Sequence, residues 1–288
     1  MRYKIGDFYI EWFSNAFKME NDEFMKKFET AQWADEKNVI KYCMKSMKAE
    51  EITQYKLLKY SSSSELYETS RGKMIIYHWA TCRFAIGYWM EDLDKEEIIC
   101  YVNSDMEKQI PVNASWFFSI SGLHRALLKR NAPVLHASYI EWREKAILFS
   151  APSQTGKSTQ ARLWEESQGA RIINDDRVLL RKTENEWKAY GYPSCGSSKI
   201  CINQTLPICA IVILEQGEVN QIQEMSFLEK VRAIASGIEV YIWNLDEIEM
   251  AFQCAQMLAK EVTVLKLVCR PDYDAVSVLK EYLSEGGK

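Results

Sequence analysis

The chain has 288 residues, of which 47% are hydrophobic, and its formal net charge is −4. This length is sufficient for two modest domains or one large one, with enough apolar residues for a core. The negative charge, with no basic run that alternates with aromatic residues, argues against a nucleic-acid partner. No uncharged apolar stretch approaches the roughly 20 residues of a membrane helix, and the N-terminus lacks the pattern of a signal peptide. We therefore expect a cytoplasmic protein with no membrane partner.

The first part of the chain, residues 1–112, is predicted to be an α+β domain. Strand-like runs rich in aromatic and β-branched residues alternate with polar turns, as half-buried antiparallel strands do. The predicted strands are residues 3–12, 54–60, 74–79, 84–90 and 98–102, and helices are predicted near 24–28 and 39–47. We find no catalytic motif in this part. We expect it to contribute substrate binding or oligomer contacts. The sequence does not decide whether the chain forms a homo-oligomer.

Residues 113–288 are predicted to form an α/β nucleotide-binding core. Their elements alternate between apolar runs typical of buried strands and segments with helical spacing of apolar residues. Strands are predicted at 134–140, 145–150, 170–174, 208–214 and 262–268, and helices at 114–130, 158–167, 247–260 and after Pro271.

A phosphate-binding loop lies between the strand at 145–150 and the helix at 158–167. Its sequence, Ala-Pro-Ser-Gln-Thr-Gly-Lys-Ser from residue 151, fits the pattern that ends in Gly-Lys-Ser/Thr, except that Ala151 replaces the first Gly. Backbone N–H groups at a helix N-terminus hold phosphate oxygens, the lysine reaches the β- and γ-phosphates, and the hydroxyl ligates Mg²⁺. Ala151 is compatible with such a loop if its φ is negative. The residues predicted to bind nucleotide are Ser153, Gln154, Thr155, Gly156, Lys157, Ser158 and Thr159.

A pair of carboxylates, Asp175 and Asp176, directly follows the predicted strand at 170–174. Adjacent side chains on a strand point to opposite faces, so the two can take different roles. Phosphoryl transfer requires one carboxylate for Mg²⁺ and, for a hydroxyl acceptor, another near the incoming oxygen. A solvated Asp-Asp turn is the alternative. Arg177, the next residue, is interpreted as a surface ion-pair residue, with neutralisation of phosphate charge as the alternative.

These motifs together resemble the HPr(Ser) kinase/phosphorylase group of the ATP-dependent phosphoenolpyruvate carboxykinase superfamily. The resemblance covers residues 134–282 and rests on Leu-His-Ala-Ser at 135–138, the loop at 151–158, and Asn-Asp-Asp at 174–176. Tyr-Gly-Tyr-Pro-Ser-Cys-Gly at 190–196 is similar to a loop of the small kinases of peptide-modification systems, including those that phosphorylate a serine of lasso-peptide precursors.

The resemblance implies a mixed sheet with flanking helices and an ATP/Mg²⁺-dependent kinase. Lys157 would bind the phosphates, and Ser158 with Asp175 or Asp176 would hold Mg²⁺. The other aspartate would accept the proton of a serine hydroxyl on a peptide or small protein, and His136 would lie beside the pair. Which aspartate has which role stays open.

Two departures and several alternatives limit this interpretation. The segment used for phosphorolysis and the Lys/His manganese pair of carboxykinases are not recognisable, so we expect no reverse activity and no decarboxylation. A small-molecule hydroxyl kinase, a plain nucleotide hydrolase and a non-catalytic ATP-binding regulatory protein are the alternatives. The kinase is favoured over the regulatory protein because the chain has both carboxylates and His136, whereas ATP binding alone requires only the loop.

Overall fold

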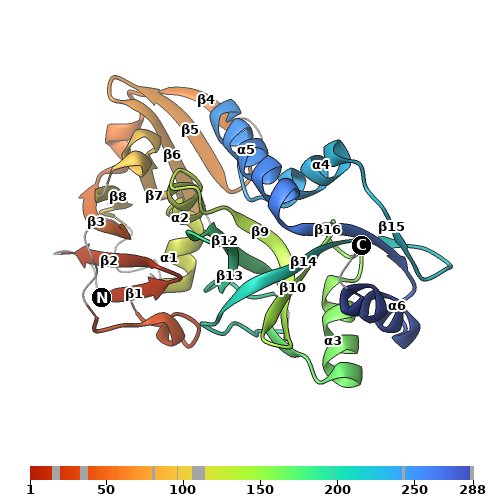
Figure 1. Ribbon diagram of the computed structural model, residues 1–288. Coiled ribbons are helices and arrows are strands. Elements are labelled where there is room, and N and C mark those ends of the chain that lie inside the picture. Colours follow the sequence, from red (N-terminus) through yellow and green to blue (C-terminus); the bar gives the residue numbers. More distant parts are fainter. Residues whose placement is uncertain are drawn as a thin grey trace. The chain divides into compact units, whose positions relative to one another are not determined.

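The computed structural model describes residues 1–14, 20–32, 38–79, 82–95, 97–105, 114–196, 198–241 and 244–285. The chain divides into two compact units, Met1–Ala126 and Leu127–Lys288 (Figure 1). The sequence placed the division after residue 112, whereas the structure groups the helix α1 (Ala114–Ile120) with the first unit. Its Phe117 ring lies 5.4 Å from the ring of Tyr42, and its Phe118 ring lies 5.5 Å from that of Tyr3, which accounts for the grouping.

The first unit is built on one mixed sheet of eight strands in the order β1-β2-β3-β8-β7-β6-β5-β4. The strands β2, β3 and β8 pair in parallel, and the other neighbours are antiparallel. The bounds are β1 (Arg2–Ile5), β2 (Phe8–Ser14), β3 (Val39–Met47), β4 (Lys56–Tyr60), β5 (Ser64–Thr69), β6 (Gly72–Trp79), β7 (Cys82–Trp89) and β8 (Glu97–Asn103), with 3-10 turns η1 (Met25–Phe28), η3 (Ala49–Ile52) and η4 (Met90–Asp94).

The predicted helix at residues 39–47 is wrong, because this segment forms the strand β3. Ile40, Tyr42 and Met44 are buried while their neighbours are less buried, which is the two-residue period of a strand. β3 lies between β2 and β8, so its conformation is set by partners distant in the sequence.

The predicted helix at 114–130 is broken into α1 and α2 (Leu123–Leu128). The break is at Gly122, which has φ of 75°, a left-handed conformation that side chains disfavour. A Cβ at this position would also lie 2.6 Å from the hydroxyl oxygen of Tyr88. Gly122 therefore ends the first helix instead of being tolerated inside a longer one.

The second unit has the mixed α/β class that the sequence predicts. Its strands are β9 (Val134–Trp142), β10 (Lys145–Ser150), β11 (Arg171–Asn174), β12 (Arg177–Lys182), β13 (Trp187–Gly191), β14 (Thr205–Gln216), β15 (Gln221–Gln223) and β16 (Thr263–Cys269). The strands β10, β14 and β16 are parallel neighbours. Five strands form a closed ring of pairings: β10 pairs with β9, β9 with β12, β12 with β13, β13 with β14, and β14 with β10.

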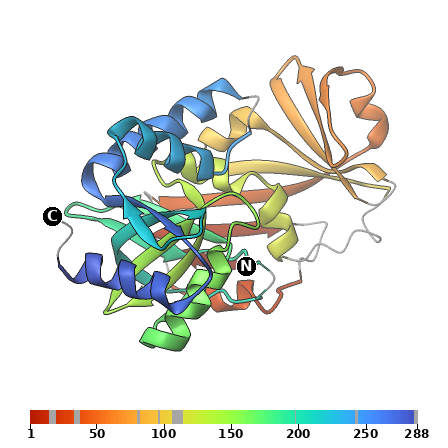
Figure 2. The same cartoon turned by 90° about the vertical axis from the view of Figure 1, so that its right-hand side faces the viewer.

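Two helices cover each face of this sheet. The helices α4 (Phe227–Gly237) and α5 (Leu245–Glu261) pack on one apolar cluster, and α3 (Lys157–Gln168) and α6 (Tyr273–Ser284) pack on another. Figures 1 and 2 show the two pairs on opposite sides of the sheet. Within the described residues, no helix is long and apolar enough to cross a bilayer.

Three of these helices begin at a capping side chain. Ser226, Asn244 and Asp272 accept hydrogen bonds from backbone N–H groups in the first turns of α4, α5 and α6. Such caps satisfy N–H groups that have no partner inside the helix. The helix α3 differs: it begins after Gly156, and no side chain of the described residues caps it. Its first N–H groups are therefore not occupied by a capping side chain.

Candidate functional site

The strand β9 brings the two sequence motifs together. One edge of β9 pairs with β10, where Ala137 lies opposite Ser150, the last residue before the loop. The other edge pairs with β12, where His136 lies opposite Arg177, the residue that follows the two aspartates. The phosphate-loop motif and the Asp-Asp motif are thus held on either side of His136.

The loop at residues 151–156 joins β10 to α3. Ala151 is not among the described residues with positive φ, so the alanine fits this position without left-handed strain. The left-handed positions are instead Gln154, with φ of 66°, and Gly156, with φ of 113°. A Cβ on Gly156 would meet no atom within 4 Å, so the glycine is required by its backbone conformation and not by space.

Lys157 is folded back over this loop. Its residue is only 7% exposed, and Nζ donates hydrogen bonds to the carbonyl oxygens of Ala151, at 2.9 Å, and Pro152, at 3.2 Å. Burial lowers the pKa of the Lys157 amine, and the nearby Asp176 carboxylate opposes that effect. The positively charged amine of Lys157 therefore lies within the loop, next to the first turn of α3.

Asp176 is surrounded by positive and hydrogen-bonding groups. His136 Nδ1 lies 3.2 Å from Asp176 Oδ1 and 2.9 Å from the Asp176 carbonyl oxygen, and an Arg177 guanidinium nitrogen lies 2.6 Å from Oδ2. Both neighbours of Nδ1 are acceptors, so Nδ1 carries a proton. Burial by itself would raise the pKa of the Asp176 carboxyl, but the His136 hydrogen bond and the charges of Arg177 and Lys157 lower it below its ordinary value.

Asp175 has a different environment. It is 5% exposed, Oδ1 accepts a hydrogen bond from the Gly196 backbone N–H at 2.8 Å, and Oδ2 accepts one from Ser198 at 3.1 Å. The carboxylate of Asp175 therefore anchors the loop after β13, whereas that of Asp176 faces the cationic groups.

Asn174 fixes the turn that carries both aspartates. It is fully buried. Its amide nitrogen donates to the carbonyl oxygens of Tyr192 and Ser194, and its Oδ1 accepts from the N–H groups of Asp176 and Arg177. The side chain uses its hydrogen-bonding capacity to join the Asp-Asp turn to the loop that the sequence singled out at 190–196.

Arg177 forms ion pairs, as the sequence suggested, but its partners are Asp176 of the candidate site and Glu239. Its Nε lies 2.9 Å from Glu239 Oε2, and a terminal nitrogen lies 2.8 Å from the Ser194 hydroxyl oxygen. Burial opposes its charge, but Glu239 and Asp176 raise the pKa of the guanidinium. Ser194 lies in the 190–196 segment that the sequence singled out, and Arg177 directly follows the Asp-Asp motif, whereas Glu239 belongs to no motif.

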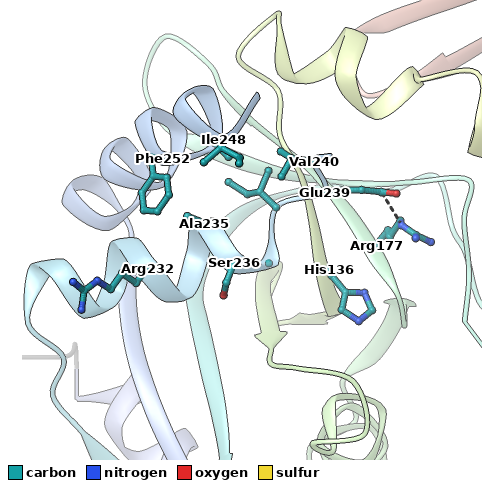
Figure 3. Close-up of a pocket in the computed structure, with 12 residues that line it drawn as sticks. His136, Arg177, Arg232, Ala235, Ser236, Glu239, Val240, Ile248 and Phe252 are labelled. Atoms are coloured by element: carbon teal, nitrogen blue, oxygen red, sulfur yellow. Dashed lines mark hydrogen bonds and ion pairs between the residues drawn. The ribbon is translucent and has the colours of Figure 1, made fainter. Parts of the chain in front are cut away.

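A cavity of about 350 Å³ is lined by most of the predicted site residues. Thr155 lies outside it and lines a neighbouring cavity with Ser153 and Gln154. A third cavity, of about 490 Å³, shares His136 with the first (Figure 3). The residues that line the first cavity are His136, Ser153, Gln154, Gly156, Lys157, Ser158, Thr159, Asp175, Asp176 and Gly196.

The described part of the chain contains no group of three or more His, Cys, Asp or Glu side chains placed to hold a metal ion. Mg²⁺ does not require such a group, because it is commonly held by one or two carboxylates together with substrate phosphates and water. Ser158, Asp175 and Asp176, the predicted magnesium ligands, line one cavity and supply oxygen atoms of the type that Mg²⁺ prefers.

Residues 98–270 match the family model of ScmC, the SynChlorMet cassette protein. The chain belongs to the ScmC family. The matched region includes all the predicted site residues of this ScmC-family chain. No curated protein matches the chain in sequence. The structure of the HPr(Ser) kinase/phosphatase from Coxiella burnetii is weakly similar, with a TM-score of 0.30 and 13% identity over 53% of this chain and 88% of that chain.

Proposed function

We propose that this chain is an ATP- and Mg²⁺-dependent kinase that transfers the γ-phosphate to a hydroxyl, namely a serine of a peptide or small protein. The observation that carries the proposal is the cavity of about 350 Å³, which is lined both by the loop at 153–159 and by Asp175, Asp176 and His136. A phosphate site and a pair of carboxylates in one cavity are the minimum that hydroxyl phosphorylation requires.

The loop and the start of α3 would bind the phosphates of ATP. No side chain of the described residues caps the N–H groups at the start of α3, so they would donate to phosphate oxygens, and the dipole of α3 favours negative charge at this end. Lys157 would exchange its two carbonyl acceptors for the β- and γ-phosphate oxygens, with a stronger charge-assisted contact. Binding would thus draw the Lys157 amine from the loop toward the nucleotide.

Asp176 is the better candidate for the residue that accepts the proton of the attacking hydroxyl. The carboxylate of Asp175 binds two backbone N–H groups and so has a structural role in the 196–198 loop, whereas that of Asp176 contacts the side chains of His136 and Arg177, which hold it in the charged form that can accept a proton. In the transfer, the hydroxyl oxygen forms a bond to the γ-phosphorus, the bond to the bridging oxygen of ADP breaks, and the hydroxyl proton moves to Asp176. His136 and Arg177 would position its carboxylate.

Asp175 and the Ser158 hydroxyl would hold Mg²⁺. Each carboxylate oxygen has two acceptor positions, so the loop contacts of Asp175 leave capacity for a metal ion. Bound Mg²⁺ supplies charge neutralisation on the β- and γ-phosphates.

The peptide acceptor and a role in peptide modification rest on the sequence resemblance to the small kinases of lasso-peptide systems, and the use of ATP fits a cytoplasmic location. A regulatory ATP-binding protein would need only the loop. ATP binding alone does not require the cluster of His136, Asp176 and Arg177, and this favours the kinase.

Transfer from γ-labelled ATP tests the proposal. The full chain is incubated with Mg²⁺, labelled ATP and panels of serine peptides and of hydroxylated small molecules. The variants are Asp176→Asn and, as a matched control, Glu184→Gln in the exposed turn between β12 and β13. We expect a labelled peptide with the wild type and the control, and a loss of about 10²- to 10⁴-fold with Asp176→Asn. Release of free phosphate with no labelled acceptor would instead indicate a hydrolase, and transfer that survives in Asp176→Asn would refute the assigned base.

A further inference from the structure

The cavity of about 490 Å³ adjoins the candidate site through His136 and is lined mainly by apolar side chains. Figure 3 shows Ala235 of α4 facing Ile248 and Phe252 of α5, with His136 and the Arg177–Glu239 pair at one end and Arg232 toward the other. Nothing in the phosphate chemistry requires this apolar space. Its volume is in the range of ligand pockets.

The charged groups at the His136 end of this cavity each have a partner of opposite charge. Arg177 Nε is bonded to Glu239 Oε2 at 2.9 Å, and the same guanidinium contacts Asp176. An apolar group placed here would therefore displace water from carbon surfaces without stripping an unpaired charge. The structure favours an apolar occupant over an ionic one at this end.

An apolar stripe on α5 extends from the cavity. Leu245, Ile248 and Phe252 are spaced i, i+3 and i+7, which places them on one face of the helix. Leu245 is 78% exposed and Phe252 is 39% exposed, although such a stripe in a globular protein normally faces a core. Seven residues of α-helix rise about 10 Å, the length of about three residues of extended peptide.

We propose, on the basis of the kinase function inferred above, that the acceptor is a peptide with a large apolar residue next to the phosphorylated serine. The apolar side chain lies between Ala235, Ile248 and Phe252, and the serine hydroxyl then reaches Asp176 past His136. Neighbouring residues of the same peptide lie along the stripe toward Leu245. The cavity alone would fit a small molecule, but the apolar stripe on α5 extends beyond the cavity and favours an extended peptide.

The test compares serine peptides that differ only at the residue beside the serine. Peptides with Phe or Leu there are compared with peptides that have Ala or Asp, using transfer from labelled ATP. Full burial of such a side chain predicts a kcat/KM about 10- to 100-fold higher for the apolar peptides. A panel of hydroxylated aromatic small molecules is included to separate a peptide acceptor from a free metabolite.

Two variants of the protein report on the cavity itself. Ala235→Trp fills it, and Phe252→Ala removes a wall from a partly exposed position that does not endanger folding. Both should raise KM for the Phe peptide at least 10-fold, with little change for the Ala peptide. Leu228→Ala is the control, because Leu228 lies on α4, is 54% exposed and does not line the cavity. ATP affinity is measured by calorimetry in every variant and should stay constant.

The outcomes separate this proposal from the function on which it rests. Equal transfer to Phe and Ala peptides, unaffected by Ala235→Trp, would overturn the apolar pocket and leave the kinase intact. Transfer to small aromatic alcohols but to no peptide would overturn the extended acceptor. Intact ATP binding with no transfer to either panel would overturn the kinase and this proposal together.

Discussion

His136 and Arg177 lie directly opposite each other on the antiparallel strands β9 and β12, and each contacts one oxygen of the Asp176 carboxylate. The contact distances are 3.2 Å from His136 Nδ1 to Oδ1 and 2.6 Å from Arg177 to Oδ2. Because both oxygens are occupied, the orientation of the carboxylate is fixed. The same contacts favour its charged form.

The lowered pKa of Asp176 predicts how stability depends on pH. A carboxyl whose pKa is lower in the folded state contributes stability above its unfolded pKa of about 3.9, and this contribution is lost as the pH falls through the folded pKa. Asp176→Asn should therefore be less stable than the wild type at pH 7, and the difference should shrink below about pH 4. Urea unfolding at several pH values measures it. A difference that grows on acidification would contradict the lowered pKa.

The two aspartates should respond differently to substitution by asparagine. In Asp175→Asn one oxygen becomes an NH₂ group that faces the backbone N–H of Gly196 or Ser198, and a buried N–H without an acceptor costs about 1–3 kcal/mol. We expect a loss of unfolding free energy of that size. Both substitutions should lower phosphate transfer, but Asp176→Asn should retain Mg²⁺-dependent ATP binding, whereas Asp175→Asn should weaken it, because Asp175 is the proposed metal ligand. Identical effects of the two substitutions on Mg²⁺-dependent ATP binding would show that the aspartates do not have separate roles.

Asn174 should be important for stability although it lies outside the proposed chemistry. Asn174→Ala removes hydrogen-bond partners from the carbonyls of Tyr192 and Ser194 and from two N–H groups of the Asp-Asp turn. The expected loss is at least about 2 kcal/mol of unfolding free energy. Asn185→Ala, in an exposed turn, is the control and should lie within about 0.5 kcal/mol of the wild type. Equal unfolding curves for the two variants would show that the hydrogen bonds of Asn174 do not stabilise the fold.

Gly191, the last residue of β13, allows the backbone at Ile202 to lie close to this strand. A Cβ at Gly191 would lie 1.8 Å from the Ile202 carbonyl oxygen, so Gly191→Ala must displace the backbone. Gly169→Ala is an informative comparison, because Gly169 has φ of 62° but open space around it and should cost only about 1–2 kcal/mol. Thermal unfolding should show a larger loss for Gly191→Ala. A smaller loss would show that this approach is not constrained.

The fold was predictable where local patterns decide it. In the second unit, β9, β10, β11, β14 and β16 contain the apolar runs that the sequence predicted as strands, and α3 follows the loop that starts it, whereas β12, β13, β15 and α4 were not predicted. The errors occurred where distant residues decide. Residues 39–47 become a strand because β2 and β8 flank them, and Gly122 breaks a helix where the Tyr88 hydroxyl, 34 positions earlier, leaves no room for a side chain.

The same distinction holds for the candidate site. The motif pattern located Lys157, the two aspartates and His136, which line one cavity in the structure. It did not indicate Glu239, which reaches Arg177 across 62 residues of sequence. It also left the aspartates unassigned, because the loop that occupies the oxygens of Asp175 is placed by the folded chain.

Calorimetric titration of the full chain with ATP in the presence of Mg²⁺ tests the central claim most directly. The variants are Lys157→Ala and, as the control, Lys145→Ala, at the exposed start of β10. We predict that ATP binds the wild type and the control at a single site, and that Lys157→Ala weakens binding at least 10-fold, because a partly buried charge-assisted contact is lost. No binding of ATP, or equal binding by Lys157→Ala and the wild type, would contradict the account.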